Sequence, residues 1–247
     1  MKIFYFTTTG NSLAVARAIG GELLSIVGAL SGSETGFADD EAIGVVCPVY
    51  FGELPAPVAE FLERVKLSAP YRFLVLTCGN TPAFAVKAPG EWDYVRSIRM
   101  VDNYFPMFDV AKQVRDLPRK RVGEHLAEIV ADIRARRHFL EAPTLYGRVA
   151  GWWMRMFPLS PLAYRRFYID GEKCNGCGTC GRMCPIGNIA MAGMMPAIGE
   201  RCLTCGACYH NCPSGAIRYR GEKSRVQYRH EGCLLYTSPS PRDRTRS

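Results

Sequence analysis

The chain has 247 residues, of which 48% are hydrophobic and 22% are charged, and its formal net charge is +8. This composition is typical of a globular protein of one or two domains and excludes a disordered tail. No apolar run reaches the about 18 residues of a membrane-spanning helix, and no signal-peptide cleavage site follows the N-terminus, so we expect a cytoplasmic protein whose cysteines are reduced or bound to metal.

The N-terminal segment predicts a buried strand, a polar turn and a helix. Residues 2–6 are apolar, β-branched or aromatic, which is typical of a buried strand. The turn Thr7-Thr8-Thr9-Gly10-Asn11-Ser12 follows, and a predicted helix then carries an apolar stripe of Leu13, Val15, Ala16, Ile19, Leu23 and Leu24. Hydroxyl and N–H groups at a helix N-terminus can hold a phosphate. An ordinary helix cap would use the same residue types.

Two further segments repeat this strand–loop pattern. Residues 43–47 and 72–77 predict buried strands, with a helix from about Pro55 to Lys66 between them. The loops that follow the strands are Pro48-Val49-Tyr50-Phe51-Gly52-Glu53 and Cys78-Gly79-Asn80-Thr81. Alternating strands and helices predict a parallel sheet that binds a ligand at the carboxyl ends of its strands.

The segment after Asn80 predicts a short or distorted helix, because Pro82, Pro89 and Gly90 interrupt its pattern. Residues 94–101 could supply the fifth strand. Cys47 and Cys78 close two of the predicted strands, and we interpret both as buried apolar side chains and not as redox thiols.

Residues 118–138 predict a basic helix with an apolar face of Val122, Leu126, Ile129, Val130 and Ile133. The next segment, 141–168, mixes tryptophan, methionine and arginine. One interpretation is a surface for a membrane or a partner. We prefer a linker that packs two domains together, because Pro158 and Pro161 would break a long amphipathic helix.

Eight of the 11 cysteines form two copies of one motif. The copies are Cys174-x-x-Cys177-x-x-Cys180-x-x-x-Cys184-Pro185 and Cys202-x-x-Cys205-x-x-Cys208-x-x-x-Cys212-Pro213, and each cysteine recurs 28 residues later. Three thiolates at this spacing can bind one [4Fe–4S] cluster, while the fourth ligates the other cluster.

The spacing therefore assigns Cys174, Cys177, Cys180 and Cys212 to one cluster, and Cys202, Cys205, Cys208 and Cys184 to the other. Structural zinc is the alternative, because zinc also binds paired cysteines. Zinc ribbons place a long loop between two pairs, which differs from the pattern of this chain.

These motifs resemble known families. Residues 169–221 closely resemble the bacterial two-cluster ferredoxin domain, and the Thr7–Ser12 turn is similar to the FMN-phosphate loop of flavodoxins. Over roughly residues 1–230, the chain resembles the EFR1-type flavodoxin–ferredoxin fusion family. The matching segments are Phe4-Tyr5-Phe6, Thr9-Gly10-Asn11-Ser12, Pro48-Val49-Tyr50-Phe51-Gly52, Asp102-Asn103-Tyr104 and Cys184-Pro185-x-Gly187-Asn188-Ile189.

The resemblance implies an α/β fold: a flavodoxin-like, doubly wound, parallel five-stranded sheet, followed by a small α+β two-cluster ferredoxin domain. It also implies FMN, bound by Thr7, Thr8, Thr9, Gly10, Asn11, Ser12, Pro48, Tyr50, Phe51, Gly52, Gly79 and Asn80. We expect the FMN domain at 1–140, the linker or docking segment at 141–168, the ferredoxin domain at 169–221 and a remnant at 222–232.

Residues 233–247 resemble the translated read-through of a sequencing adapter, and we expect them to be non-native. Without their three arginines and one aspartate, the net charge falls from +8 to +6. Two clusters, each about −2 relative to neutral thiols, and an FMN phosphate of about −2 would bring the protein near neutrality. The apparent basicity is therefore no argument for binding nucleic acid.

The leading hypothesis is an electron-transfer iron–sulfur flavoprotein that passes electrons between FMN, two [4Fe–4S] clusters and unidentified redox partner proteins. No residue is then a catalytic acid or base. One alternative is a flavin-dependent reductase of a quinone, a disulfide or another small electrophile. Another is a docking scaffold whose flavodoxin-like domain no longer binds FMN.

Overall fold

A computed structural model describes residues 1–157 and 162–231, which group into two compact units. Among these residues, the first unit comprises 1–7, 11–101 and 116–157, and the second comprises 8–10, 102–115 and 162–231. The tail predicted to be non-native, and the prolines at 158 and 161, lie outside the described residues.

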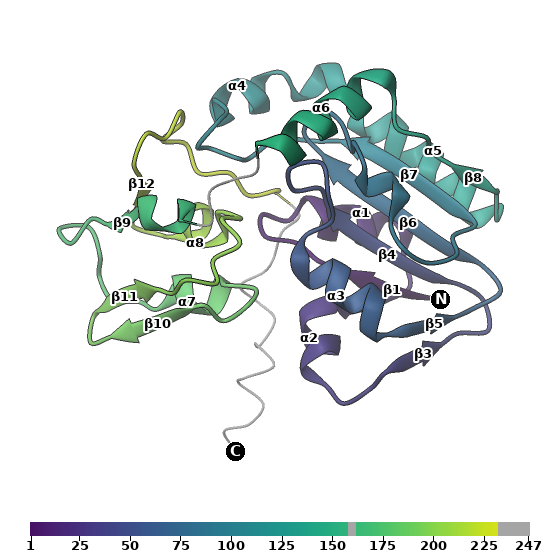
Figure 1. Cartoon of the computed structure of the whole chain (residues 1–247), viewed down its shortest axis with the longest axis horizontal. Helices are drawn as coiled ribbons and strands as arrows, with labels where there is room; N and C mark the ends of the chain where they lie inside the picture. The colour runs from purple at the N-terminus through teal and green to yellow at the C-terminus, as the bar shows by residue number, and fades with distance from the viewer. Residues whose placement is uncertain (158–161, 232–247) are drawn as a thin grey trace. The chain divides into compact units, whose positions relative to one another are not determined.

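The first unit contains a parallel sheet with the strand order β2-β1-β4-β6-β7-β8 (Figure 1). The strands are β1 (Lys2–Tyr5), β2 (Glu22–Ser25), β4 (Ile43–Pro48), β6 (Arg72–Cys78), β7 (Tyr94–Arg99) and β8 (Phe139–Leu140). The strands predicted at 2–6, 43–47 and 72–77 are confirmed as β1, β4 and β6, and the segment 94–101 supplies β7. The predicted number of five is wrong, because the short β8 adds a sixth strand beside β7.

The predicted first helix is too long. Helix α1 spans Asn11–Ile19, and the chain then turns at Gly20 and Gly21, whose φ angles are 85° and 118°. This left-handed backbone favours glycine and ends the helix. Leu23 and Leu24, which the apolar stripe placed on the helix, instead lie in β2 and pair with Ile3 and Phe4.

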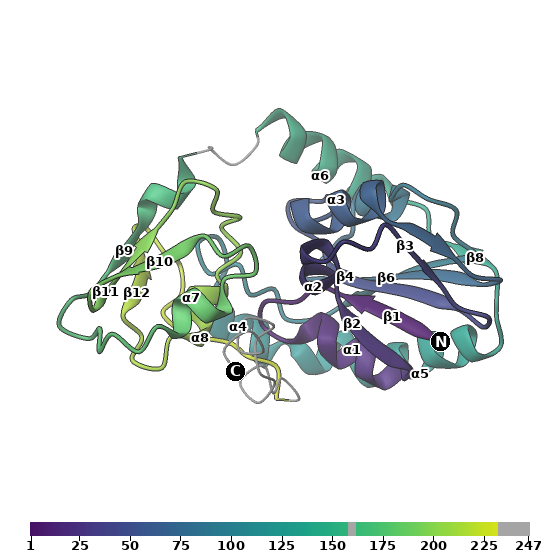
Figure 2. The same cartoon turned by 90° about the horizontal axis from the view of Figure 1, so that it is seen from below.

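Helices cover both faces of the sheet. Figure 2 shows α1 and α5 (Val122–Arg134) on one face, and α3 (Ala56–Arg64) and α6 (Leu145–Met156) on the other. The remaining elements of this unit are α2 (Ile26–Ser31), the strand pair β3 (Gly36–Ala38) and β5 (Lys66–Ser68), and the 3₁₀ turns η1 (Ala85–Lys87) and η2 (Leu117–Lys120). The 3₁₀ turn η1 stands where an interrupted helix was predicted, and the basic helix begins only at Val122.

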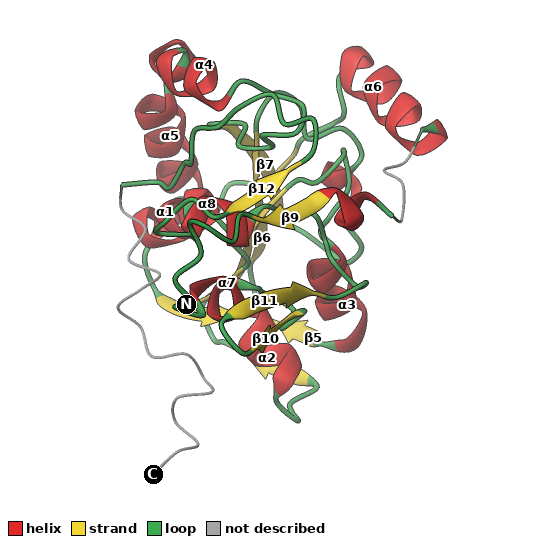
Figure 3. Ribbon diagram, turned by 90° about the vertical axis from the view of Figure 1, so that its left-hand side faces the viewer, coloured by secondary structure: helices red, strands yellow, loops and turns green. Residues whose placement is uncertain are grey.

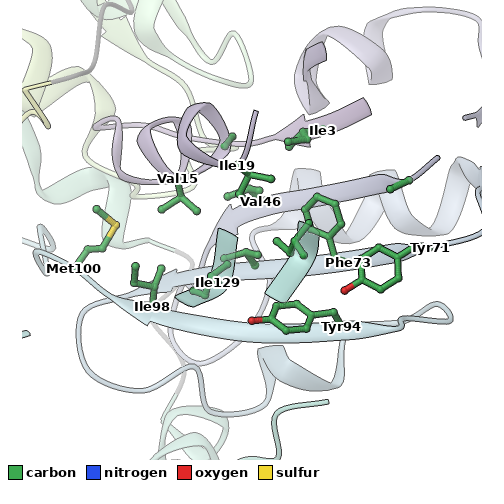
Figure 4. Close-up of a cluster of buried hydrophobic side chains, with 14 residues drawn as sticks. Ile3, Val15, Ile19, Val46, Tyr71, Phe73, Tyr94, Ile98, Met100 and Ile129 are labelled. Atoms are coloured by element: carbon green, nitrogen blue, oxygen red, sulfur yellow. The ribbon is translucent and has the colours of Figure 1, made fainter. Parts of the chain in front are cut away.

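Apolar side chains fill the space between the sheet and the α1–α5 layer. Figure 4 shows this cluster, with Ile3, Val46 and Phe73 from the strands facing Val15 of α1 and Ile129 of α5. Alternate strand residues point to the opposite face, where the ring of Phe4 packs on Phe61 of α3 at 4.9 Å. Cys47 and Cys78 are buried, as predicted, and burial raises the pKa of the Cys47 thiol.

Gly44 gives a test of this packing. Gly44 pairs with Phe73 on β6, and a Cβ on Gly44 would lie 2.1 Å from the Phe73 ring. We expect Gly44→Ala to lower the free energy of unfolding by about 3 kcal/mol, because a close-packed core resists an added methyl group. The measurement is urea unfolding followed by circular dichroism.

Gly123→Ala is the matched control. A Cβ on Gly123, in α5, would meet no atom within 4 Å, so this change should be neutral or stabilise by about 0.4–1 kcal/mol. Equal unfolding midpoints for the two variants would contradict the packing described for Gly44.

The second unit is small and has two antiparallel strand pairs (Figure 3). Its elements are α4 (Val110–Arg115), η3 (Ala163–Arg166), β9 (Phe167–Ile169), α7 (Thr179–Met183), β10 (Ile189–Ala192), β11 (Met195–Ile198), α8 (Ala207–Asn211) and β12 (Ile217–Tyr219). Strand β9 pairs with β12, and β10 pairs with β11. Its core includes Phe105, whose ring stacks on Tyr209 with centroids 3.7 Å apart.

Helix α6 lies within the segment predicted to be a linker. Gly147 and Gly151 are buried on one face, against Thr81 and Phe84 of the first unit. Its other face exposes large side chains, which are Leu145, Tyr146, Val149, Trp152, Trp153 and Met156. None of the helices in the described residues is both long enough and apolar enough to cross a membrane.

Candidate functional site

The eight motif cysteines of the second unit line two cavities of similar size. The first, called site I here, has about 290 Å³ of empty space and contains Cys174, Cys177, Cys180 and Cys212 in its lining. The second, site II, has about 330 Å³ and contains Cys184, Cys202, Cys205 and Cys208. Each cavity therefore combines three cysteines of one repeat with the last cysteine of the other.

Two short helices separate the third and fourth cysteines of each repeat. A left-handed glycine, Gly178 or Gly206, precedes α7 or α8 and places the third cysteine of its repeat in the first turn. The fourth cysteine caps the C-terminus of the same helix, as Cys184 or Cys212. A five-residue helix is about 7.5 Å long, so cysteines at its two ends can reach different cavities.

Backbone N–H groups point at several of the sulfurs. The amide of Asn188 donates to Cys184 Sγ at 3.2 Å, and at the equivalent position of the second repeat the amide of Ala216 donates to Cys212 Sγ at 3.3 Å. The amide of Thr204 donates to Cys202 Sγ at 3.3 Å. Such bonds orient sulfur ligands and stabilise their negative charge.

The thiols of the two sites have different surroundings. At site I, a hydrogen bond with the Thr179 hydroxyl lowers the pKa of Cys177, although burial raises the pKa of Cys180. At site II, burial raises the pKa of Cys205 to about 12 and the pKa of Cys208 well above its ordinary value. A metal would therefore have to displace protons that the free thiols of site II hold tightly.

The donor set of each site fits an iron–sulfur cluster. Both cavities offer four cysteine sulfurs, which are the ligands that [4Fe–4S] clusters use. Within residues 1–157 and 162–231, no group of three or more His, Cys, Asp or Glu side chains is placed to hold a single metal ion. The four cysteines of each site line the same cavity, as the ligands of a multi-iron cluster must.

A comparison with protein families agrees with this chemistry. Residues 166–213 match the family described as a 4Fe-4S dicluster domain. The match supports a ferredoxin-like domain with [4Fe–4S] clusters and a role in electron transfer. No curated protein matches the chain.

Helix α8 carries buried polar side chains next to its cysteines. His210 is 1% exposed; its Nε2 lies 2.8 Å from the Asn103 carbonyl oxygen, and its Nδ1 accepts the Tyr228 N–H. One ring nitrogen accepts and the other donates, so the imidazole is neutral, and burial lowers its pKa to about 4. Asn211 donates to the Thr8 carbonyl oxygen, 3.2 Å away.

The residues predicted to bind FMN are distributed over both units. Thr8, Thr9 and Gly10 group with the second unit. Pro48 is the last residue of β4 and the others follow β1, β4 and β6, whose carboxyl ends lie at one edge of the parallel sheet of the first unit. These residues are Thr7, Asn11, Ser12, Pro48, Tyr50, Phe51, Gly52, Gly79 and Asn80.

Several of the polar side chains predicted to bind FMN already have partners. Ser12 is 1% exposed and its hydroxyl lies 2.8 Å from that of Thr77, while Asn11 Nδ2 donates to the Val101 carbonyl oxygen at 3.2 Å. In the second unit, Asn103 Nδ2 donates to Thr9 Oγ1. Helix α1 nevertheless begins at this edge with no acidic residue in its first turn, which is compatible with an anion.

The loop after β4 turns tightly. Phe51 and Gly52 have φ angles of 52° and 79°, and Tyr50 and Glu53 exchange two backbone hydrogen bonds of 3.0 Å. The half-buried ring of Tyr50 meets Phe6 edge-on, with centroids 6.4 Å apart. After β6, Asn80 is exposed and its side-chain amide donates to the Tyr146 hydroxyl at 3.2 Å.

Lys120 is a residue at this edge that sequence reasoning missed. Its ammonium donates to the carbonyl oxygens of Gly79 at 2.8 Å and Met100 at 2.5 Å, and so holds the segments after β6 and β7 together. In the sequence, Lys120 is one basic residue among several, and no spacing distinguishes it. Its position depends on the packing of η2 at the sheet edge.

Proposed function

We propose that this chain is an electron-transfer iron–sulfur flavoprotein. In the second unit, Cys174, Cys177, Cys180 and Cys212 would hold one [4Fe–4S] cluster, and Cys184, Cys202, Cys205 and Cys208 the other. The first unit would hold FMN at the edge of its sheet. A flavin exchanges one or two electrons and each cluster exchanges one, so their combination converts electron pairs into single steps.

The observation that carries the proposal is the composition of the two cavities. Each is lined by four cysteines in the three-plus-one arrangement that the repeat predicts for two-cluster ferredoxins. The protein would supply ligation, orientation and hydrogen bonds to the sulfurs, while its redox partners are other proteins.

Purification under anaerobic conditions tests this proposal. The expected preparation absorbs broadly in the visible range, contains about eight irons per chain and releases FMN on denaturation. Zinc in place of iron, together with no flavin, would refute it.

The proposed FMN site is in the first unit, within the flavodoxin-like fold that the sequence resembles. Support comes from the shared edge of β1, β4 and β6, the helix N-terminus at Asn11 and the aromatic loop with Tyr50. Because the hydroxyl of Ser12 is bonded to Thr77, the phosphate would be held mainly by backbone N–H groups at the start of α1. Lys120 would position the Gly79 loop.

Tyr50 provides the test of the flavin site. We expect Tyr50→Leu to weaken FMN binding about 2–12-fold, because an aromatic contact contributes about 0.5–1.5 kcal/mol beyond its buried area. FMN fluorescence titration of the apoprotein measures the dissociation constant. Tyr50→Phe keeps the ring and should bind FMN like the wild type. Equal affinities for the Leu and Phe variants would place the flavin away from Tyr50.

A further inference from the structure

The two repeats differ at several positions around the cysteines, and three of these positions place a hydroxyl group or a cation near site I. Their sequences are related by a shift of 28 residues, so Thr179 corresponds to Ala207, Arg182 to His210 and Ile186 to Ser214. Because the fourth cysteine of each repeat crosses to the other cavity, Thr179 and Ser214 line site I, whereas Ala207 and Ile186 line site II. Each hydroxyl group at site I thus has an apolar counterpart at site II.

The hydroxyl of Thr179 is oriented toward a sulfur. Thr179 Oγ1 lies 3.3 Å from Cys177 Sγ, and it accepts a hydrogen bond of 3.0 Å from the Arg182 guanidinium. A metal-bound thiolate only accepts hydrogen bonds, so the hydroxyl hydrogen must point to the sulfur. Arg182 leaves the hydroxyl oxygen occupied as an acceptor and therefore favours this orientation.

Ser214 supplies a second hydroxyl to the same site. Its Oγ lies 3.6 Å from Cys212 Sγ, within hydrogen-bonding distance for sulfur. The counterpart of Ser214 at site II, Ile186, has no polar side-chain group to offer Cys184.

Site I also has more positive charge and more solvent exposure near its cysteines than site II. Arg182 is an exposed cation whose guanidinium also donates to the Cys177 carbonyl oxygen at 3.0 Å. Its counterpart His210 is buried, and its two ring nitrogens face the Asn103 carbonyl oxygen and the Tyr228 N–H. Among the eight cysteines, all within the described residues, Cys177 of site I is the exposed one.

We propose that the two clusters are not equivalent, and that the cluster of site I accepts an electron before the cluster of site II. This inference rests on the proposed function. Uptake of one electron from an external low-potential reductant changes the charge of a core with its four thiolates from about −2 to about −3. The hydroxyl groups of Thr179 and Ser214, the cation of Arg182 and the nearby solvent all stabilise that added charge.

The difference gives the chain a direction of electron flow. An electron that reaches site II is passed to site I, which is the lower-energy position. Site I also carries the exposed Cys177, so we assign to it the exchange of electrons with acceptors outside the chain. The three tuning residues are Thr179, Arg182 and Ser214.

A redox titration with dithionite, followed by electron paramagnetic resonance, tests this inference. The wild type should show two separable one-electron steps. Thr179→Ala with Ser214→Ala should lower the potential of the first step by at least a tenfold change in its equilibrium constant, which is 59 mV for one electron. Arg182→Gln should also lower the reduction potential of the first step. Ile186→Ser should raise the reduction potential of the second step. This single variant still tests the inference if the double variant does not assemble its clusters.

Ser224→Ala is the matched control, because it removes a buried hydroxyl of the same unit that accepts a hydrogen bond from the Val226 N–H and none from a cysteine. The reduction potentials of both steps should be unchanged in this variant. Eight irons with coincident steps, or with steps that none of the site variants moves, would overturn the inference and leave the proposed function intact. Absence of iron–sulfur clusters from the wild type would overturn both.

Discussion

Replacing Cys184 and Cys208 together with alanine is expected to remove one cluster and leave the other. Both thiols line site II, so the iron content should fall from about eight to about four per chain, and one redox step should remain. The effect is large because a cluster that loses two of its four thiolates has no replacement ligand in this apolar cavity. Iron analysis and paramagnetic resonance of the reduced protein measure it.

The double variant Cys208→Ala with Cys212→Ala is the matched comparison. These two cysteines belong to one repeat but line different cavities, so each cluster loses one ligand and both should be lost or degraded. If each repeat instead bound its own cluster, the outcomes of the two double variants would be exchanged. The pair therefore distinguishes crossed from uncrossed ligation with the same number of substitutions.

Phe105→Ala is expected to destabilise the second unit by about 3–5 kcal/mol, the usual cost of deleting a buried aromatic side chain. Phe105 is fully buried and stacks on Tyr209, which directly follows Cys208, a proposed cluster ligand. In urea, the midpoint for loss of the visible cluster absorbance should fall by at least about 1 M, given slopes of about 1–3 kcal/mol per molar urea.

Phe108→Ala is the control for this change. Phe108 lies three residues further along the same segment but is 36% exposed, so its removal should alter stability by no more than about 0.5 kcal/mol. If the Phe105 variant behaved in the same way, residues 102–115 would not belong to the core of the second unit.

The sequence features that predicted the structure best were long apolar runs and the cysteine repeat. The runs at 43–47 and 72–77 lie in the middle of the sheet, where burial on both faces favours apolar side chains. The repeat placed all eight cysteines in one region, because cluster ligation depends on local spacing. These elements could be predicted because the residues that specify them lie close together in the sequence.

Other features depend on distant contacts and could not be predicted in this way. Leu23 and Leu24 fit a helical stripe as well as a strand, and only pairing with β1 decides between them. Asp102–Arg115 has no cysteine and no motif of the second unit, yet it belongs to that unit through packing such as that of Phe105. The hydrogen bonds of Lys120 likewise depend on where η2 lies at the sheet edge.

The stacking of Phe105 on Tyr209 also has a consequence for biosynthesis. The two rings are separated by 104 residues, so Phe105 leaves the ribosome long before its partner. At about 5–20 residues per second, translation of the intervening chain takes about 5–20 seconds. During that time the apolar segment around Phe105 has no core to enter, and chaperones that hold nascent chains are expected to bind there. The cluster-binding unit completes its folding only after the last cysteine has been synthesised.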